Sequence, residues 1–395
     1  MVRLTKPHPG QETIIRSEAR FRVVACGRRF GKTEAGKIML LERALRGGRC
    51  WWLAPTYGMA AQVWRDLRAA CGQIGGVRAS ERERRLDLPG GGLIAVRSAH
   101  RPDLLRGMGL DFAVLDEAAF MTPDVWPQVV RPMLLERQGG ALFLSSPNGR
   151  NWFYDLFALA QGGAPGWAAF HFTSWDNPLI PRAELDAIRR ATPERVWREE
   201  YLAEFVADAG QVFRGVQAAA TAPPHAAPQP GAVYSAGVDW GRDGDFTAIA
   251  VIDAGARRVV ALDRFTGMTW ALQRGRLAAL CARWQPATVW AEANSIGSPN
   301  VEALQAEGLP VRPFHTSAAS KGPLIEGLAL AIERGDLALL PDAALLAELT
   351  AYRAERLPGG GYRYSAPPGG HDDCVIALAL AWHGVRFGGA RVDFA

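Results

Sequence analysis

The residues with the clearest chemical potential lie at positions 26–33 (CGRRFGKT). An apolar run, 21–25, precedes them, and an amphipathic helix pattern, 34–45, follows. A strand, a glycine-bearing turn and Lys-Thr at a helix start are typical of a phosphate-binding loop, in which backbone N–H groups and the helix N-terminus hold phosphate oxygens. Lys32 would contact the β- and γ-phosphates of a nucleotide, and the Thr33 hydroxyl would bind Mg²⁺.

The loop departs from the full pattern at one position. Cys26 stands six residues before Lys32, where glycine is expected, and Gly27 comes one place later. An ordinary strand–turn–helix would look similar. However, the chain has four lysines among its 45 basic residues, and one of them follows Gly31. Lysine is a compact point charge that arginine does not replace inside a loop, so its use here favours phosphate binding.

Residues 111–117 (DFAVLDE) form a second candidate, because an apolar run ends in two carboxylates. We expect a buried parallel strand to deliver them at its carboxyl end, where open α/β sheets bind ligands. Asp116 would hold the Mg²⁺ of the nucleotide, and Glu117 would polarise the attacking water. Acidic pairs at strand ends are common, so the preceding loop carries much of this prediction.

Two polar stretches lie near the same elements. Ser145 and Ser146 end an apolar run at 141–144 and could sense the γ-phosphate, although Pro-Asn-Gly at 147–149 would favour a turn in any case. Gln11, upstream of the first strand, could read the adenine edge with its amide, but a solvated turn residue is an equally good interpretation.

A second set of carboxylates lies in the C-terminal part. Asp239 ends a predicted strand, Glu292 ends another, and Asp372 and Asp373 precede the last helix pattern. Acidic side chains that converge from different elements can hold two Mg²⁺ or Mn²⁺ ions about 4 Å apart, which cleave phosphodiesters. Adjacent helix residues point about 100° apart, so Asp372 and Asp373 should contribute unequally.

The elements that position these residues indicate an α/β protein with two domains. Residues 1–210 carry the loop and its strands, with helices predicted at 152–160 and 181–206 as a helical lid region. An Ala/Pro-rich linker is predicted at 211–232. Residues 233–395 predict three successive strands, then alternating helices and strands that include a strand at 337–340. This is the order of an RNase H-like fold.

Composition limits the class of protein. The chain has 395 residues, enough for two or three domains, and no apolar run approaches a membrane span. Its five cysteines are scattered without metal spacing, which fits a reducing cytoplasm. Residues 1–232 carry 30 basic and 23 acidic side chains, whereas residues 233–395 carry 15 and 17. The basic first part weakly favours a polyanionic partner.

Taken together, these motifs resemble the large terminase subunit of tailed double-stranded DNA phages. The resemblance lies in residues 27–33, 114–117, 145–149 with 153–155, 173–178, 237–241 and 371–373, and it covers nearly the whole chain. It implies an N-terminal P-loop ATPase domain of the RecA/ASCE type and a C-terminal RNase H-like nuclease domain. It also implies ATP-driven packaging of double-stranded DNA, with cleavage of concatemeric DNA.

The resemblance adds roles and partners. Arg28 and Arg29 would belong to the nucleotide loop, Arg106 would be an arginine finger offered to a neighbouring subunit, and Ser145 and Ser146 would couple hydrolysis to motion. The implied partners are a portal protein on a procapsid, a small terminase subunit and further copies of the chain in a ring, within the host cytoplasm and without a membrane.

Two other classes are considered. A helicase–nuclease would need a second RecA-like lobe, for which residues 150–232 are too few. A non-catalytic DNA-binding assembly protein with a decayed loop at Cys26 would lack ATPase activity, which an assay can distinguish.

Overall fold

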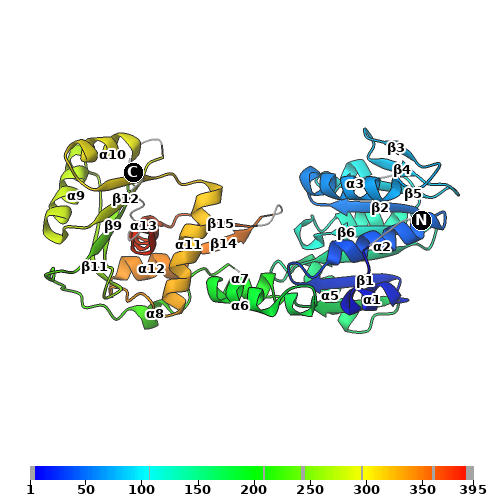
Figure 1. The fold of residues 1–395 in the computed structure, drawn as a ribbon, viewed down its shortest axis with the longest axis horizontal. Helices are drawn as coiled ribbons and strands as arrows, with labels where there is room; N and C mark the ends of the chain where they lie inside the picture. The colour runs from blue at the N-terminus through cyan, green and yellow to red at the C-terminus, as the bar shows by residue number, and fades with distance from the viewer. Residues whose placement is uncertain are drawn as a thin grey trace. The chain divides into compact units, whose positions relative to one another are not determined.

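The computed structural model describes residues 5–105, 107–207, 210–241, 245–294, 297–357 and 361–387. The chain forms two compact units (Figure 1). The first comprises Met1–Ala209 with Arg356–Gly360, and the second Gly210–Glu355 with Gly361–Ala395. No helix in the described ranges is long and apolar enough to cross a membrane.

An eight-stranded sheet organises the first unit, in the order β3-β4-β5-β2-β6-β7-β1-β8. The six strands from β5 to β8 in this order are parallel. The apolar runs at 21–25, within 111–117 and at 141–144 form β1, β6 and β7, which are buried as predicted. Strand β7 separates β1, which leads into the loop, from β6, which ends at Asp116. The strands are β1 (Phe21–Cys26), β2 (Arg49–Ala54), β3 (Arg78–Ser80), β4 (Arg85–Asp87), β5 (Leu93–Ser98), β6 (Phe112–Asp116), β7 (Gly140–Ser145) and β8 (Trp167–Phe172).

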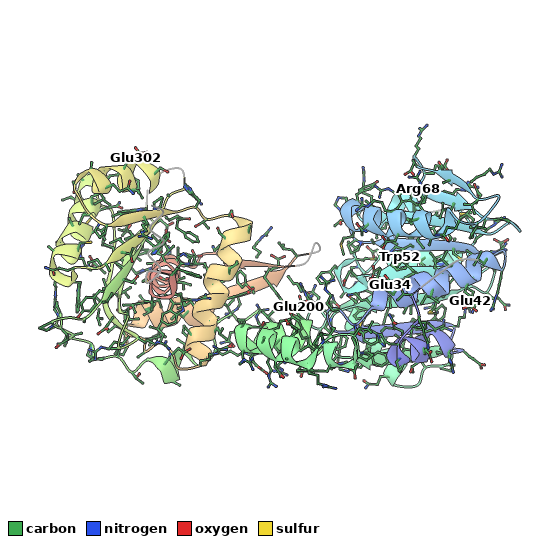
Figure 2. All side chains as sticks on the ribbon, viewed as in Figure 1. Glu34, Glu42, Trp52, Arg68, Glu200 and Glu302 are labelled. Carbon is green, nitrogen blue, oxygen red and sulfur yellow. The ribbon has the colours of Figure 1, made fainter. Side chains whose placement is uncertain are left out.

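Helices cover both faces of this sheet through separate apolar clusters. One cluster contains residues of α1 (Pro9–Arg16), α2 (Lys32–Leu45) and α3 (Tyr57–Cys71). The other contains residues of the π-helix η3 (Val125–Val130) and of α5 (Trp152–Gln161). The side chains that fill these layers are drawn in Figure 2. The short helical segments are η1 (Pro102–Leu105), η2 (Ala118–Phe120), α4 (Arg131–Met133) and η4 (Ser174–Asp176).

The prediction of one helix over residues 181–206 is wrong in its extent. It forms two shorter helices, α6 (Arg182–Ala191) and α7 (Glu194–Glu200), and residues 201–206 are not helical. Thr192 is extended at ψ 132, as expected for a residue that precedes proline, and Pro193 caps α7 instead of continuing α6.

A five-stranded sheet organises the second unit, in the order β11-β10-β9-β12-β13. Strand β9 is antiparallel to β10 and parallel to β12, so the three-strand start and the parallel continuation agree with the RNase H-like order. The strands are β9 (Tyr234–Asp239), β10 (Phe246–Asp253), β11 (Arg258–Thr266), β12 (Thr288–Glu292) and β13 (Val311–Phe314).

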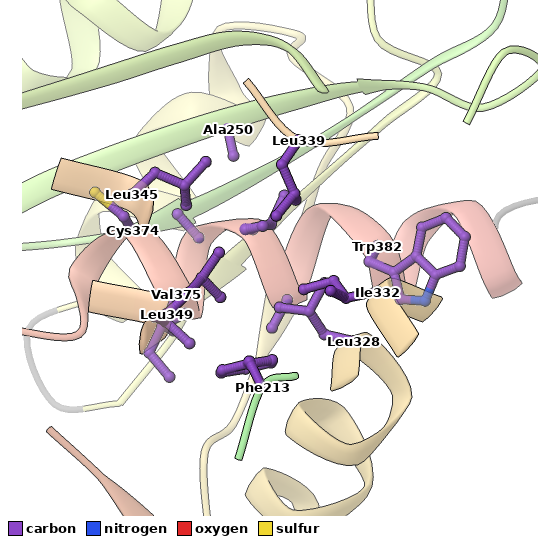
Figure 3. Packing of buried hydrophobic residues seen from close by; sticks show 14 of the residues in the cluster. Phe213, Ala250, Leu328, Ile332, Leu339, Leu345, Leu349, Cys374, Val375 and Trp382 are labelled. Atoms are coloured by element: carbon purple, nitrogen blue, oxygen red, sulfur yellow. The ribbon is translucent and has the colours of Figure 1, made fainter. Parts of the chain in front are cut away.

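The helices of this unit pack on opposite faces of its sheet (Figure 1). Helices α9 (Trp270–Trp284) and α10 (Gly297–Ala306) cover one face. Helices α11 (Ala318–Glu333), α12 (Ala343–Ala351) and α13 (Asp373–Phe387) form the other layer, with α13 directly against β9. Figure 3 shows the apolar side chains around α13, which is buried along most of its length.

Three parts of the second unit differ from the sequence prediction. Residues 337–340 form no strand and make only an isolated bridge between Ala338 and Arg258. Helix α12 and the hairpin β14 (Arg353–Arg356) and β15 (Tyr362–Ser365) were not predicted. The expected linker contains α8 (Val216–Ala219) and contributes Val212, Phe213 and Ala222 to the core, because its apolar residues pack on the second unit.

Candidate nucleotide and metal sites

The loop at residues 26–33 has the backbone of a phosphate cradle. Helix α2 begins at Lys32, and Gly31 has φ 99°, a conformation that favours glycine. No residue larger than glycine fits at position 27, because a Cβ there would lie 2.3 Å from the Tyr201 carbonyl oxygen and 2.7 Å from the Ser174 nitrogen. Cys26 is fully buried at the end of β1, so the cradle is built without a glycine at that position.

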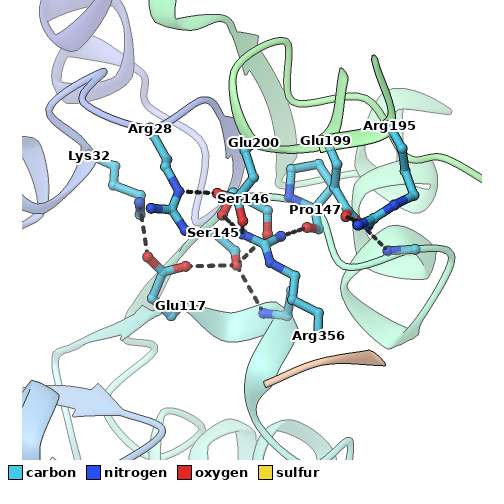
Figure 4. Close-up of polar contacts among 12 residues, drawn as sticks. Arg28, Lys32, Glu117, Ser145, Ser146, Pro147, Arg195, Glu199, Glu200 and Arg356 are labelled. Atoms are coloured by element: carbon cyan, nitrogen blue, oxygen red, sulfur yellow. Dashed lines mark hydrogen bonds and ion pairs between the residues drawn. The ribbon is translucent and has the colours of Figure 1, made fainter. Parts of the chain in front are cut away.

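Lys32 and Glu117 face each other across the loop (Figure 4). Their Nζ and Oε1 atoms lie 3.0 Å apart. Burial disfavours the charged form of both groups, but the attraction between the two charges outweighs this effect. The pKa of Lys32 is therefore raised and the pKa of Glu117 is lowered. Ser145 donates a hydrogen bond to Glu117 Oε2 at 3.2 Å, so the end of β7 contacts the same carboxylate.

Asp116 is buried beside this pair with one unsatisfied carboxylate oxygen. It is 7% exposed, and its Oδ1 has no hydrogen-bond partner among the residues that the structure describes. Burial, followed by repulsion from Glu117, raises the pKa of Asp116 to about 7. A buried acceptor without a donor, next to the start of α2, is the environment that a Mg²⁺ with its bound waters would satisfy.

Gln11 contacts the loop instead of facing solvent. Its Nε2 donates to the Gly31 carbonyl oxygen at 2.8 Å, and its Oε1 accepts from the His8 backbone N–H at 2.9 Å. The interpretation as a solvated turn residue is therefore wrong, because Gln11 is 5% exposed. These contacts use one of the two N–H groups and one of the two oxygen lone pairs of the amide.

The other residues predicted to bind the nucleotide, or to couple its hydrolysis to motion, make contacts with neighbouring loops and helices. Arg28 forms an ion pair with Glu200, at the end of α7, and Glu199 accepts from the Gly149 N–H at 3.0 Å (Figure 4). Ser146 Oγ accepts from Arg356, which also pairs with Glu200. Asn177 donates to the Arg29 carbonyl oxygen at 2.6 Å, and Thr33 lies in the first turn of α2. The expected arginine finger, Arg106, lies outside the described residues.

The second unit brings its predicted carboxylates together. Strands β9 and β12 are parallel neighbours, and Val238 pairs with Ala291, so Asp239 and Glu292 end adjacent strands. Burial, then the charge of Glu292 and a hydrogen bond to it, raises the pKa of Asp239 well above its ordinary value. Asp372 and Asp373 add to this shift, so all four carboxylates share one electrostatic environment.

Asp372 and Asp373 have different surroundings, as the helix geometry predicts. Asp372 Oδ2 lies 3.4 Å from Lys321 Nζ. Asp373 is 5% exposed, and burial, followed by the charge of Asp245, raises its pKa to about 7.

Two residues that the sequence analysis missed complete the group around Asp373. Ligand atoms of Asp245, His371 and Asp373 lie within 4.8 Å of one another, a spacing suited to a metal ion. His371 Nδ1 is 3.3 Å from Asp245 Oδ1 and 3.7 Å from Asp373 Oδ2. His371 was part of the recognised motif at 371–373, but Asp245 directly precedes β10, and only the fold brings it near α13.

A buried polar network supports the chain that follows Asp239. The Gly241 N–H donates to Thr247 Oγ1 at 2.9 Å, and Gln273 Nε2 donates to the Gly241 carbonyl oxygen at 3.1 Å. Thr247 Oγ1 in turn donates to Gln273 Oε1 at 2.8 Å. Both Gly241 backbone groups are satisfied, which fixes the main chain two residues beyond Asp239.

The fold and the two sites define a protein with a P-loop ATPase unit followed by an RNase H-like nuclease unit. Residues 24–219 match the family model described as "Terminase large subunit, T4likevirus-type, N-terminal", and residues 236–383 match "Terminase RNaseH-like domain". The chain is 34% identical to the large terminase subunit of Thermus virus P23-45, over 95% of this chain and 87% of that protein. The chain belongs to the large terminase subunits.

Two solved structures are also similar. The large terminase of a thermophilic bacteriophage is 15% identical and covers 96% of this chain and 99% of its own, with a TM-score of 0.55, which shows a shared fold. The large terminase nuclease of phage G20c, solved with bound magnesium, is 32% identical. It covers 44% of this chain and 97% of its own, with a TM-score of 0.41.

Proposed function

We propose that the first unit binds ATP with Mg²⁺ at the start of α2. The observation that carries this proposal is the orphaned, buried Asp116 oxygen beside the Lys32–Glu117 pair. Asp116 and Thr33 would hold Mg²⁺, which neutralises phosphate charge when it is bound. Gly27, Arg28, Arg29, Gly31 and Lys32 would bind the phosphates, and Gln11 the base.

Glu117 would orient the attacking water once phosphate draws Lys32 away from it. The lowered pKa of Glu117 keeps the carboxylate charged and able to accept a hydrogen bond from water. Ser145, bonded to the same carboxylate, and Ser146 would couple hydrolysis to movement. Arg106 would stabilise the transition state of a neighbouring subunit.

In the second unit, we propose that Asp239, Glu292, Asp373 and Asp372 hold two Mg²⁺ or Mn²⁺ ions, with Asp245 and His371 as added ligands. Such ions activate water and stabilise the leaving oxygen of a phosphodiester when they are bound. The raised pKa values of Asp239 and Asp373 fit this role, because a bound cation would offset both the burial and the repulsion between carboxylates that raise them.

As a large terminase subunit, the protein is an ATPase and nuclease of viral DNA packaging. We propose that it moves double-stranded DNA into a procapsid through a portal protein, as a ring of copies recruited with a small subunit in the host cytoplasm. Cleavage of concatemeric DNA would begin and end packaging. The two alternative classes lose support, because the chain belongs to the large terminase subunits and Gly31 begins α2 in a left-handed conformation.

The test assays both activities in matched variants of the full chain. Lys32→Ala should abolish ATP turnover and leave metal-dependent plasmid cleavage intact, whereas Asp239→Ala should do the reverse. Glu117→Gln should still bind ATP but lose hydrolysis, since Asp116 remains. Normal ATP turnover in Lys32→Ala, or full cleavage in Asp239→Ala or in EDTA, would refute the corresponding site.

A further inference from the structure

Glu348, on α12, holds the beginning of α13 from outside that helix. Its side chain is 7% exposed, and its Oε2 accepts a hydrogen bond from the Cys374 backbone N–H at 2.8 Å. The first N–H groups of a helix have no partner within the helix, so a carboxylate placed there satisfies them and interacts favourably with the helix dipole. The residue fixed in this way directly follows Asp373.

Arg264 lies between the Glu348 carboxylate and the Phe246 ring, which packs against His371 of the proposed metal cluster (Asp245, His371 and Asp373). Its Nε forms an ion pair with Glu348 Oε1 at 3.2 Å, without hydrogen-bond geometry, and its guanidinium carbon lies 3.4 Å from the centre of the Phe246 ring. The Phe246 ring in turn meets the His371 imidazole edge-on, with centroids 4.9 Å apart. Phe246 follows Asp245, so the chain of contacts reaches all three members of the cluster.

We propose that Glu348, held by Arg264, is a positioning residue that fixes the first turn of α13 and thereby keeps Asp373 within the metal cluster. This inference rests on the proposed nuclease function. Glu348 acts on Asp373 through the backbone N–H of the next residue, Cys374. Its contribution is that Asp373 is already placed before a metal ion binds. Groups that orient metal ligands typically contribute about 10–100-fold to metal affinity.

The test compares three substitutions in the full-length protein. Glu348→Gln keeps an acceptor for the Cys374 N–H. Glu348→Asp keeps the charge but is one methylene too short, and Glu348→Ala removes both. The control is Asp263→Asn, which breaks an exposed ion pair with Arg276 in the same unit, where the atoms lie 2.6 Å apart.

Mn²⁺ binding is measured by calorimetry, and exchange of the Cys374 amide by hydrogen–deuterium exchange in the metal-free protein. We expect Glu348→Asp and Glu348→Ala to weaken Mn²⁺ binding about tenfold or more and to speed this exchange. For Glu348→Gln and for the control, the Mn²⁺ affinity should stay within about threefold of the wild-type value, well below the roughly 10–100-fold effect of a group that orients a metal ligand.

The outcomes separate the inference from the function on which it rests. A wild-type protein that neither binds Mn²⁺ nor cleaves DNA would refute the nuclease proposal. If the wild type does both and Glu348→Asp binds Mn²⁺ equally well, the positioning role of Glu348 is refuted. Should Glu348→Ala fail to fold, the comparison of Asp with Gln still decides.

Discussion

At the scale of single residues, Glu117 adopts a strained backbone conformation at the proposed nucleotide site. Its backbone adopts a left-handed conformation, φ 53° and ψ 46°, which is uncommon for residues other than glycine. Such strain persists where the surroundings over-determine it and gathers at functional sites. Here the Lys32 ammonium and the Ser145 hydroxyl hold the carboxylate, so the strained turn directs Glu117 back over the loop.

Gln11 gives a prediction at this scale. Because its amide already supports Gly31, Gln11→Ala should weaken binding of inorganic tripolyphosphate as well as of ATP. The loss should be larger for ATP, since the remaining donor and acceptor of the amide are expected to contact the adenine. Each lost hydrogen bond corresponds to about 0.5–1.5 kcal/mol. Calorimetry with both ligands measures this, and unchanged affinity for both would contradict it.

The residues of the two sites were predictable to different degrees. Lys32, Asp116 and Asp239 follow or precede elements with strong sequence patterns, so their types and positions identified them. Asp245 had no such signal, because a single carboxylate in a turn resembles a solvated residue. Its importance depends on distances to His371 and Asp373 that only the folded chain provides.

At the scale of elements, β9 and α13 approach so closely that their backbones touch. A Cβ at Gly237 would lie 2.1 Å from the Ala377 carbonyl oxygen, and one at Gly384 would lie 2.1 Å from Ser235 Oγ. The Ala381 backbone nitrogen would lie 2.3 Å from the same Gly237 Cβ, and Ala377 and Ala381 are fully buried. Asp239 ends β9 and Asp373 begins α13, so this contact sets the spacing of two of the carboxylates that we propose as metal ligands.

Gly237→Ala should therefore destabilise the protein and remove cleavage, whereas ATP turnover should persist. Overpacking usually costs about 1–3 kcal/mol, and contact with backbone atoms places this case at the upper end. Gly275→Ala is the matched control, because a Cβ there meets nothing within 4 Å on helix α9. It should stabilise by about 0.5–1 kcal/mol. Thermal unfolding measures both changes, and equal effects would contradict the role given to the contact.

Element prediction succeeded where burial imposes a simple pattern. The continuous apolar runs of β1, β6 and β9 identified buried strands in both units. Strand β8 was missed because its residues are mostly half-buried at the edge of the sheet. Residues 337–340 have a strand-like apolar pattern, but their burial comes from packing against α13 and its neighbours instead of from a sheet.

At the scale of the whole chain, all five cysteines are free and buried, and both units contribute them. Burial raises the pKa of Cys26 and Cys50 to about 12 and of Cys71 and Cys281 to about 11, and it also raises the pKa of Cys374. The thiolate is the reactive form, so none of these thiols is activated.

The native protein should accordingly show almost no reaction with a thiol-specific disulfide reagent at pH 8. The same protein in guanidinium chloride should titrate five thiols. Absorbance of the released thiolate gives both numbers. Rapid reaction of one thiol in the native state would contradict the buried position of that cysteine.

The backbone contact between β9 and α13 also limits how the nuclease can be controlled. At Gly237 and Gly384 even a Cβ would lie 2.1 Å from a neighbouring atom, so the strand and the helix have little room to shift against each other. The carboxylates of the proposed nuclease site are therefore expected to keep one fixed spacing. We therefore expect the proposed nuclease site to be silenced during packaging by keeping DNA or metal ions away from it, and not by changing the spacing of its carboxylates.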